Sequence, residues 1–129
     1  MELNRFNREN TVTRIYTPKV RIYSKGIISL NQAFVIETKF KAGDTIEIVQ
    51  DTKNPKDWYL TKNSKPNGFP LRKNATDSGL NMSSRGVCSK IMKSLDKEGD
   101  HSIACLISTN PINVEGEDFY AIITKSIYQ

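Results

Sequence analysis

The segment KFKAGDTIEIVQD, residues 39–51, joins a Gly-Asp turn to an alternating apolar stretch. Ile46 and Ile48 alternate with polar neighbours, as in a strand with one buried face. Just upstream, NQAFVIETKF (31–40) places its apolar residues on one helical stripe behind Asn31, a favourable N-cap. The sequence therefore predicts a short helix that Gly43 ends, a tight turn at Gly43-Asp44 and then a strand.

Most of the remaining chain has strand patterns, and one further segment is helical. Strands are predicted around VRIYSKGIISL (20–30), WYLTKN (58–63), GLNMS (79–83), HSIACLIST (101–109) and DFYAIITKSIY (118–128), with a brief one near Phe69. Residues 83–99 predict the clearest helix, which is amphipathic, is capped by a serine and ends at Gly99. The predicted class is α+β, mainly β, with antiparallel strands, one short and one clear amphipathic helix, and an interleaved dimer as one arrangement.

The predicted organisation is a basic arm (1–18), a hairpin-and-helix unit (19–62) and a strand-helix-strand-strand unit (63–129) packed on it as one compact domain. The chain has 129 residues, of which 37% are hydrophobic, and no apolar run approaches the length of a membrane span. Its polar N-terminus lacks the apolar core of a secretory signal. We therefore expect a cytoplasmic protein without a membrane partner.

Residues typical of catalytic and metal sites are scarce. The two cysteines, Cys88 and Cys105, lie in apolar segments and are predicted to be small buried side chains. The single histidine, His101, lies in a polar turn, so that neither a zinc site nor a histidine base is indicated. The sequence predicts no catalytic, cofactor or metal site, and a protein that is not an enzyme.

Positive charge is concentrated in two blocks. Residues 1–25 hold six basic and two acidic residues, and residues 52–93 hold nine basic and two acidic residues. Residues 26–51 and 94–129 carry net charges of −2 and −4, which leaves +5 for the chain. Segregated positive charge is what a polyanion-binding surface requires, and a solvated basic surface is the alternative.

Residues 19–51, KVRIYSKGIISLNQAFVIETKFKAGDTIEIVQD, resemble the AbrB/SpoVT-type swapped-hairpin DNA-binding domain. In that family a strand leads through glycine into an apolar strand, a short helix, a Gly-Asp turn and a second alternating strand. Gly26, the AFVI segment (33–36) and Gly43-Asp44 occupy these places. The resemblance implies an interleaved homodimer that contacts DNA through basic residues near the start of the hairpin.

The leading hypothesis is a protein that binds DNA rather than RNA, as a homodimer or higher homo-oligomer. On the strand at 20–25, Val20 and Ile22 are predicted to face the core and Arg21, Tyr23 and Lys25 the other side. The candidate nucleic-acid-binding residues are Arg5, Arg8, Arg14, Lys19, Arg21, Lys25, Lys62, Arg72 and Lys73.

Two alternatives remain open from the sequence. One is a single-stranded-DNA-binding protein, broadly similar to the Whirly type, in which bases stack on Trp58, Tyr59 and Phe69. Alternation along the strand allows only one of Trp58 and Tyr59 to face a given side, and tryptophan is commonly a core residue. The other is a structural or assembly subunit of a phage or mobile element, in which long edge strands pair between copies.

Overall fold

The computed structural model describes residues 2–3, 17–63 and 65–128, which form ten strands and two helices. The strands are β1 (Lys19–Tyr23), β2 (Ile27–Leu30), β3 (Thr45–Gln50), β4 (Trp58–Asn63), β5 (Phe69–Pro70), β6 (Arg72–Lys73), β7 (Leu80–Ser83), β8 (Ser102–Ile107), β9 (Ile112–Val114) and β10 (Glu117–Tyr128). The helices are α1 (Gln32–Thr38) and α2 (Arg85–Ser94). The predicted class, α+β and mainly β with antiparallel strands, is confirmed.

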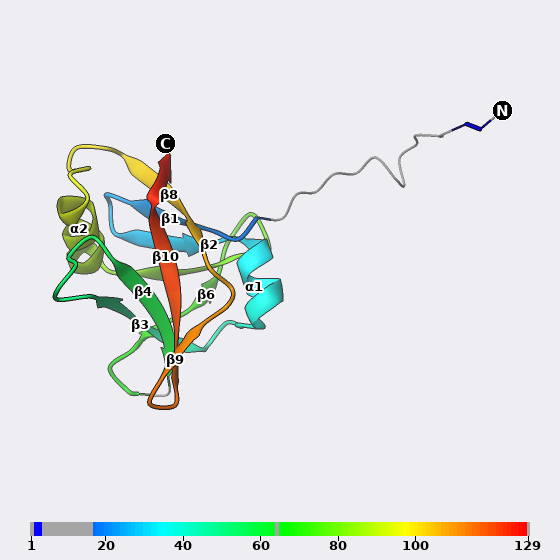
Figure 1. Cartoon of the computed structure of the whole chain (residues 1–129), viewed down its shortest axis with the longest axis horizontal. Helices are drawn as coiled ribbons and strands as arrows, with labels where there is room; N and C mark the ends of the chain where they lie inside the picture. Colours follow the sequence, from blue (N-terminus) through cyan, green and yellow to red (C-terminus); the bar gives the residue numbers. More distant parts are fainter. Residues whose placement is uncertain (1, 4–16, 64, 129) are drawn as a thin grey trace.

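The strands form one antiparallel sheet that curls into a nearly closed barrel (Figure 1). Their order is β5-β3-β4-β10-β8-β1-β2-β7-β6, with β9 paired to β10. The two outermost strands, β5 and β6, are separated along the chain by Leu71 alone. Leu71 also donates its N–H to Asp44 O at 2.8 Å and accepts the Gly43 N–H at 2.9 Å. The Gly-Asp turn therefore anchors the point at which the barrel closes.

The inner face of the barrel and the two helices form one core. Alternate residues of β1, Val20 and Ile22, are fully buried, as their pattern predicted. In Figure 1, α1 and α2 lie on opposite sides of the sheet. Phe34 of α1 contacts Phe40 and Tyr120 edge-to-face, with ring centroids 5.3 and 5.6 Å apart. The apolar stripe of α2 adds Cys88, Ile91 and Met92 to the core.

Both helices begin at the caps that the sequence predicts but end earlier than expected. Asn31 accepts the N–H of Phe34 at 3.2 Å, and Ser84 accepts that of Val87 at 3.2 Å. The prediction that Gly43 ends α1 is wrong, because Lys39 takes the left-handed conformation there, with φ 61°. Likewise α2 ends at Ser94, five residues before Gly99. Both glycines instead serve the turns that lead into the next strands.

The segment between the last two predicted strands contains a strand of its own. β9 pairs with the start of β10 through a tight turn at Glu115-Gly116. Strands from the two predicted units alternate in the sheet, since β10 and β8 lie between β4 and β1. In the part of the chain that the structure describes, no helix has the length and apolar character needed to cross a bilayer.

Candidate nucleic-acid interface

Four neighbouring strands bring polar side chains from distant parts of the sequence into one row. Across β6, β7, β2 and β1, the residues opposite one another are Arg72, Asn81, Ser29 and Arg21. The sequence neighbours of Arg21, Val20 and Ile22, point into the core, so this row faces outward. The same outer surface carries Lys19, Tyr23 and Lys25. We call these residues, Lys19, Arg21, Tyr23, Lys25, Ser29, Arg72 and Asn81, the basic face.

Both arginines of the basic face donate hydrogen bonds to neutral side chains. Arg21 Nη1 donates to Ser102 Oγ at 3.0 Å, and Arg72 Nη2 donates to Asn81 Oδ1 at 3.2 Å and to Ser83 Oγ. Among the described residues, neither guanidinium forms an ion pair with a carboxylate. The hydrogen bonds orient the two side chains and leave both guanidinium groups without an ion-pair partner among the described residues, which favours an anionic ligand.

A groove crosses the basic face at Ser29. It consists of two adjoining depressions of about 210 and 380 Å³ that share Tyr23, Ser29, Asn74 and Asp77 in their linings. Tyr23 lies on one wall, where Lys25 Nζ lies 5.6 Å from its ring centroid. Residues of the segment 74–77 also line the groove. The groove thus combines an aromatic ring and cations with a polar loop.

Side-chain hydrogen bonds fix that loop against the sheet. Asp77 Oδ1 accepts the Gly79 N–H at 2.7 Å and the Asn74 amide at 2.8 Å. Asn74 also donates to Ser29 Oγ at 3.2 Å and accepts from the Asn81 amide at 2.6 Å. The sequence analysis named none of Asn74, Asp77 and Asn81 as site residues, although Asn81 lies in the strand predicted at 79–83. The run of Asn, Asp, Ser and Gly at 74–79 indicated a side-chain-stabilised turn, but not its position beside Arg21.

The structure brings together four of the nine predicted cations, Lys19, Arg21, Lys25 and Arg72. Lys73 pairs with the buried Leu80, so it lies on the alternate side of β6 from Arg72. Lys62 is elsewhere, at the mouth of the barrel, 3.3 Å from Asp44 and 5.7 Å from the Phe40 ring centroid. The predicted contacts of the arm, Arg5, Arg8 and Arg14, lie outside the described residues.

The three aromatic residues predicted to stack with bases do not form a common surface. Trp58 is only 4% exposed, and its Nε1–H donates to Ser94 Oγ of α2 at 2.8 Å. Phe69 is half-buried and packs against the core. Tyr59 lies on the outer face of β4 opposite Val49. The ring of Trp58 is thus inaccessible to a base in this fold, because α2 covers it and supplies its hydrogen-bond acceptor.

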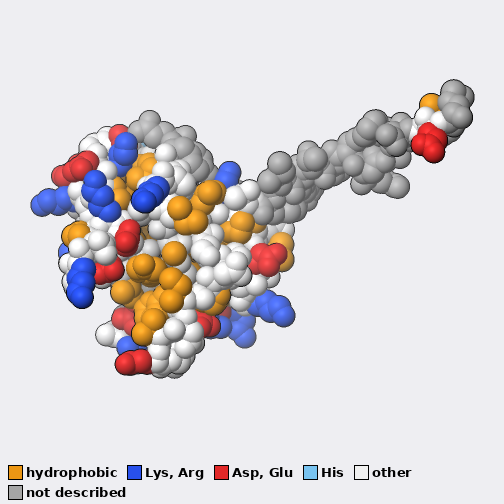
Figure 2. All heavy atoms as spheres, viewed as in Figure 1, with side chains coloured by type: hydrophobic (Ala, Val, Ile, Leu, Met, Phe, Trp, Pro, Cys, Tyr) orange, Lys and Arg blue, Asp and Glu red, His pale blue; other side chains and the backbone are white. Residues whose placement is uncertain are grey.

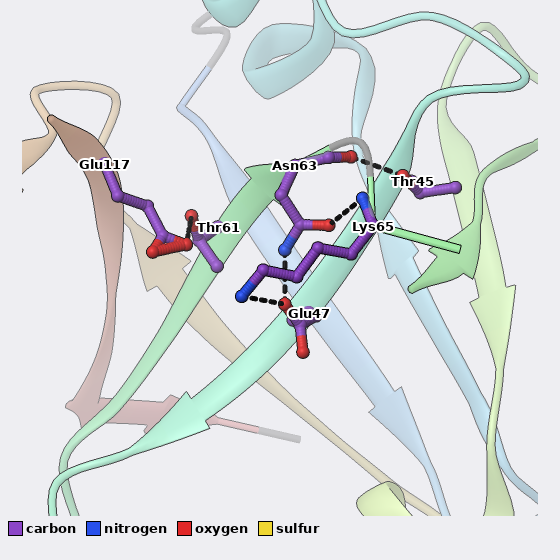
Figure 3. A network of polar contacts seen from close by, with 6 residues as sticks. All are labelled: Thr45, Glu47, Thr61, Asn63, Lys65 and Glu117. Carbon is purple, nitrogen blue, oxygen red and sulfur yellow. Dashed lines mark hydrogen bonds and ion pairs between the residues drawn. The ribbon is translucent and has the colours of Figure 1, made fainter. Parts of the chain in front are cut away.

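On the far side of the barrel, the polar groups compensate one another (Figure 3). Glu47 of β3 pairs with Lys65 Nζ at 3.8 Å and accepts a hydrogen bond from the Asn63 amide. Thr61 donates to Glu117 Oε1 at 3.2 Å. Lys65 is therefore matched by a carboxylate, in contrast to the arginines of the basic face.

In the described part of the chain, the cysteines and acidic residues form neither a reactive thiol site nor a metal site. Cys88 and Cys105 are free, are fully buried as predicted, and burial raises the pKa of each thiol to about 11. Such thiols are poor nucleophiles near neutral pH. Among the residues that the structure describes, no three His, Cys, Asp or Glu side chains are grouped so that they could hold a metal ion.

By its structure, the protein is an antiparallel, nearly closed barrel with a basic, grooved outer face. Comparisons with protein-family models, with curated proteins and with solved structures find no significant match for this chain.

Proposed function

We propose that the protein is a non-enzymatic DNA-binding protein that contacts nucleic acid through the basic face. One observation carries the proposal. Strand pairing places Arg21 and Arg72 in one row on the same face of the sheet, and hydrogen bonds to neutral partners orient both side chains. The two residues are three strands apart, which corresponds to about 14 Å at roughly 4.8 Å per strand. Two oriented guanidinium groups at this spacing suit separate phosphates of one nucleic acid.

The distribution of charge along the chain supports the same surface. Arg14 precedes β1 closely in the sequence, and Arg5 and Arg8 precede Arg14. The chain from the basic arm therefore leads into the strand that carries Lys19 and Arg21. Few Asn, Gln or Arg residues lie on either helix, so binding is proposed to depend mainly on phosphate contacts from the sheet and arm.

The test is a fluorescence-anisotropy titration of single-stranded and duplex DNA at several salt concentrations. The double variant Arg21→Gln/Arg72→Gln should reduce affinity on the order of 10-fold or more at low salt. It should also reduce the slope of log K against log salt by about two, because two phosphate contacts are lost.

The matched control is Lys39→Gln/Lys53→Gln, which removes the same charge from two exposed residues outside the groove. It should leave the salt slope unchanged within error. If wild-type protein binds neither form of DNA at low salt, or if both double variants weaken binding equally, the basic face is not the interface.

A separate surface favours a second candidate function, that of a self-assembling subunit. Figure 2 shows hydrophobic side chains gathered over β4, β10 and β9. Ile112 and Val114 of β9 are each 52% exposed, and they line a depression with Val49, Tyr59 and Phe119. Among the described strands β9 pairs only with β10, so its outer edge is open to a strand of a second copy.

Self-assembly predicts a response to salt opposite to that of DNA binding. Asp51 lines the same depression, and the repulsion between its copies across a dimer weakens as salt rises. We expect sedimentation to show a dimer that strengthens with salt and that Ile112→Asp weakens by about 10-fold or more. Ile36→Asp, at an exposed position of α1, should not affect it. A monomer at all concentrations would contradict this candidate.

A further inference from the structure

We propose that the groove at Ser29 binds one unpaired nucleobase carrying an exocyclic amino group, as part of a single DNA strand. This inference rests on the proposed DNA-binding function and specifies its ligand. It concerns residues that the charge pattern of the sequence did not indicate, above all Asp77, Asn74 and Tyr23.

Among the carboxylate and amide oxygens of the groove residues, one accepts no hydrogen bond from the described residues. Asp77 uses Oδ1 for the Gly79 N–H and the Asn74 amide, while its Oδ2 has no donor among the described residues. The side-chain oxygens of Asn74 and Asn81 are each already engaged by a donor. An incoming base therefore meets a carboxylate oxygen that accepts but cannot donate.

This acceptor discriminates between bases. Cytosine, adenine and guanine each present an amino group that can donate to a carboxylate. Thymine has no amino group, and the carbonyl oxygens beside its one ring N–H would be repelled by Asp77. The groove should therefore favour oligo(dC) over oligo(dT), two pyrimidine strands that carry the same backbone charge.

The surroundings of Asp77 suit the other parts of a nucleotide. The half-buried ring of Tyr23 lines both depressions, and a base would stack on it beside Lys25 and the His101 ring, whose centroid lies 6.1 Å away. Arg21 and Lys19 line the smaller depression and Lys25 lines the larger, so cations are present at both ends of the groove for the flanking phosphates. The smaller depression, about 210 Å³, is below the range of roughly 300–1,000 Å³ for drug-sized ligands, which suits a single base.

The geometry also favours a single strand over a duplex. A base stacked on Tyr23 must have one face free, and in a duplex both faces of an interior base are covered by neighbouring base pairs. Only an unpaired nucleotide can enter without the cost of unpairing, which is a few kcal/mol for a duplex.

The deciding experiment compares oligo(dC) and oligo(dT) of equal length by anisotropy titration against wild type and Asp77→Asn. Wild type should bind oligo(dC) about 10-fold more tightly than oligo(dT). The amide introduced by Asp77→Asn would keep the Oδ1 acceptor for Gly79 and place an N–H donor where Oδ2 was. The variant should therefore lose or reverse the preference, since the new donor suits a thymine carbonyl.

The control is Glu37→Gln, which removes one negative charge at an exposed position of α1 that does not line the groove. It should retain the preference for oligo(dC), and thermal melting should show all three proteins folded. Equal binding of both oligonucleotides by wild type would overturn the base-binding groove while leaving the proposed DNA-binding function intact. A preference that survives in Asp77→Asn would also overturn it. Failure to bind either oligonucleotide at low salt would overturn the base-binding groove, and it would overturn the proposed DNA-binding function as well only if duplex DNA is not bound either.

Discussion

Phe34→Ala is expected to lower the free energy of unfolding by about 3–5 kcal/mol, the range for removing a buried phenylalanine. Phe34 is fully buried, and its ring contacts those of Phe40 and Tyr120. These rings belong to α1, the segment after it, and β10, so that the substitution would leave a cavity where the helix meets the barrel. Loss of the edge-to-face contacts adds to the loss of buried apolar area.

Urea unfolding followed by circular dichroism measures this effect. Ile36→Ala is the matched control, because Ile36 lies on the same helix with 57% of its surface exposed. The control should change stability by less than about 0.5 kcal/mol. Equal effects of the two substitutions would show that α1 does not pack on the barrel through Phe34.

Gly79→Ala is expected to destabilise the protein by about 3 kcal/mol and to disturb the groove. A Cβ at this position would lie 2.3 Å from the backbone oxygen of Leu30, 2.7 Å from the Asn74 amide nitrogen and 2.9 Å from Asp77 Oδ1. The Leu30 oxygen belongs to β2, which pairs with β7, so the strain cannot be relieved by rotating one side chain. Any shift would move the loop that holds Asp77.

Gly86→Ala provides the control for this effect. Gly86 lies in the first turn of α2, where an added Cβ would approach nothing closer than Ser84 Oγ at 4.0 Å. Alanine favours the helix there and should stabilise the protein by about 0.5–1 kcal/mol. Thermal or urea unfolding should therefore show a lower free energy of unfolding for Gly79→Ala and a higher one for Gly86→Ala than for the wild type. A neutral Gly79→Ala would show that β2 and β7 do not approach as closely as described.

The Gly79 position shows how closely the candidate site depends on the closure of the barrel. The loop 74–79 connects β6, at the edge of the sheet, to β7, and its side chains bond to Ser29 on β2. Leu71, between β5 and β6, binds the backbone of the Gly-Asp turn that precedes β3. The groove is thus built by the same segment that closes the barrel, which makes its shape sensitive to core substitutions.

The sequence by itself determined the faces of the main strands and the starts of both helices. Alternation placed Val20 and Ile22 inside and Arg21 outside, because successive side chains of a strand point to opposite sides. The caps Asn31 and Ser84 determined where the helices begin, since the first turn needs acceptors for its free N–H groups. These features depend on residues close together in the chain, which is why they could be predicted.

Only the tertiary structure decided which elements are neighbours. Arg72 and Arg21 lie in one row because β1, β2, β7 and β6 pair in that order. This order depends on how the whole sheet curls. The burial of Trp58 depends on Ser94 of α2, a contact between distant segments. Likewise, Asp77 is a candidate base-binding residue only because the fold places its loop beside Ser29 and Tyr23. Local pattern determines which face a residue occupies, but strand order and register determine which residues share that face, and those depend on packing along the entire chain.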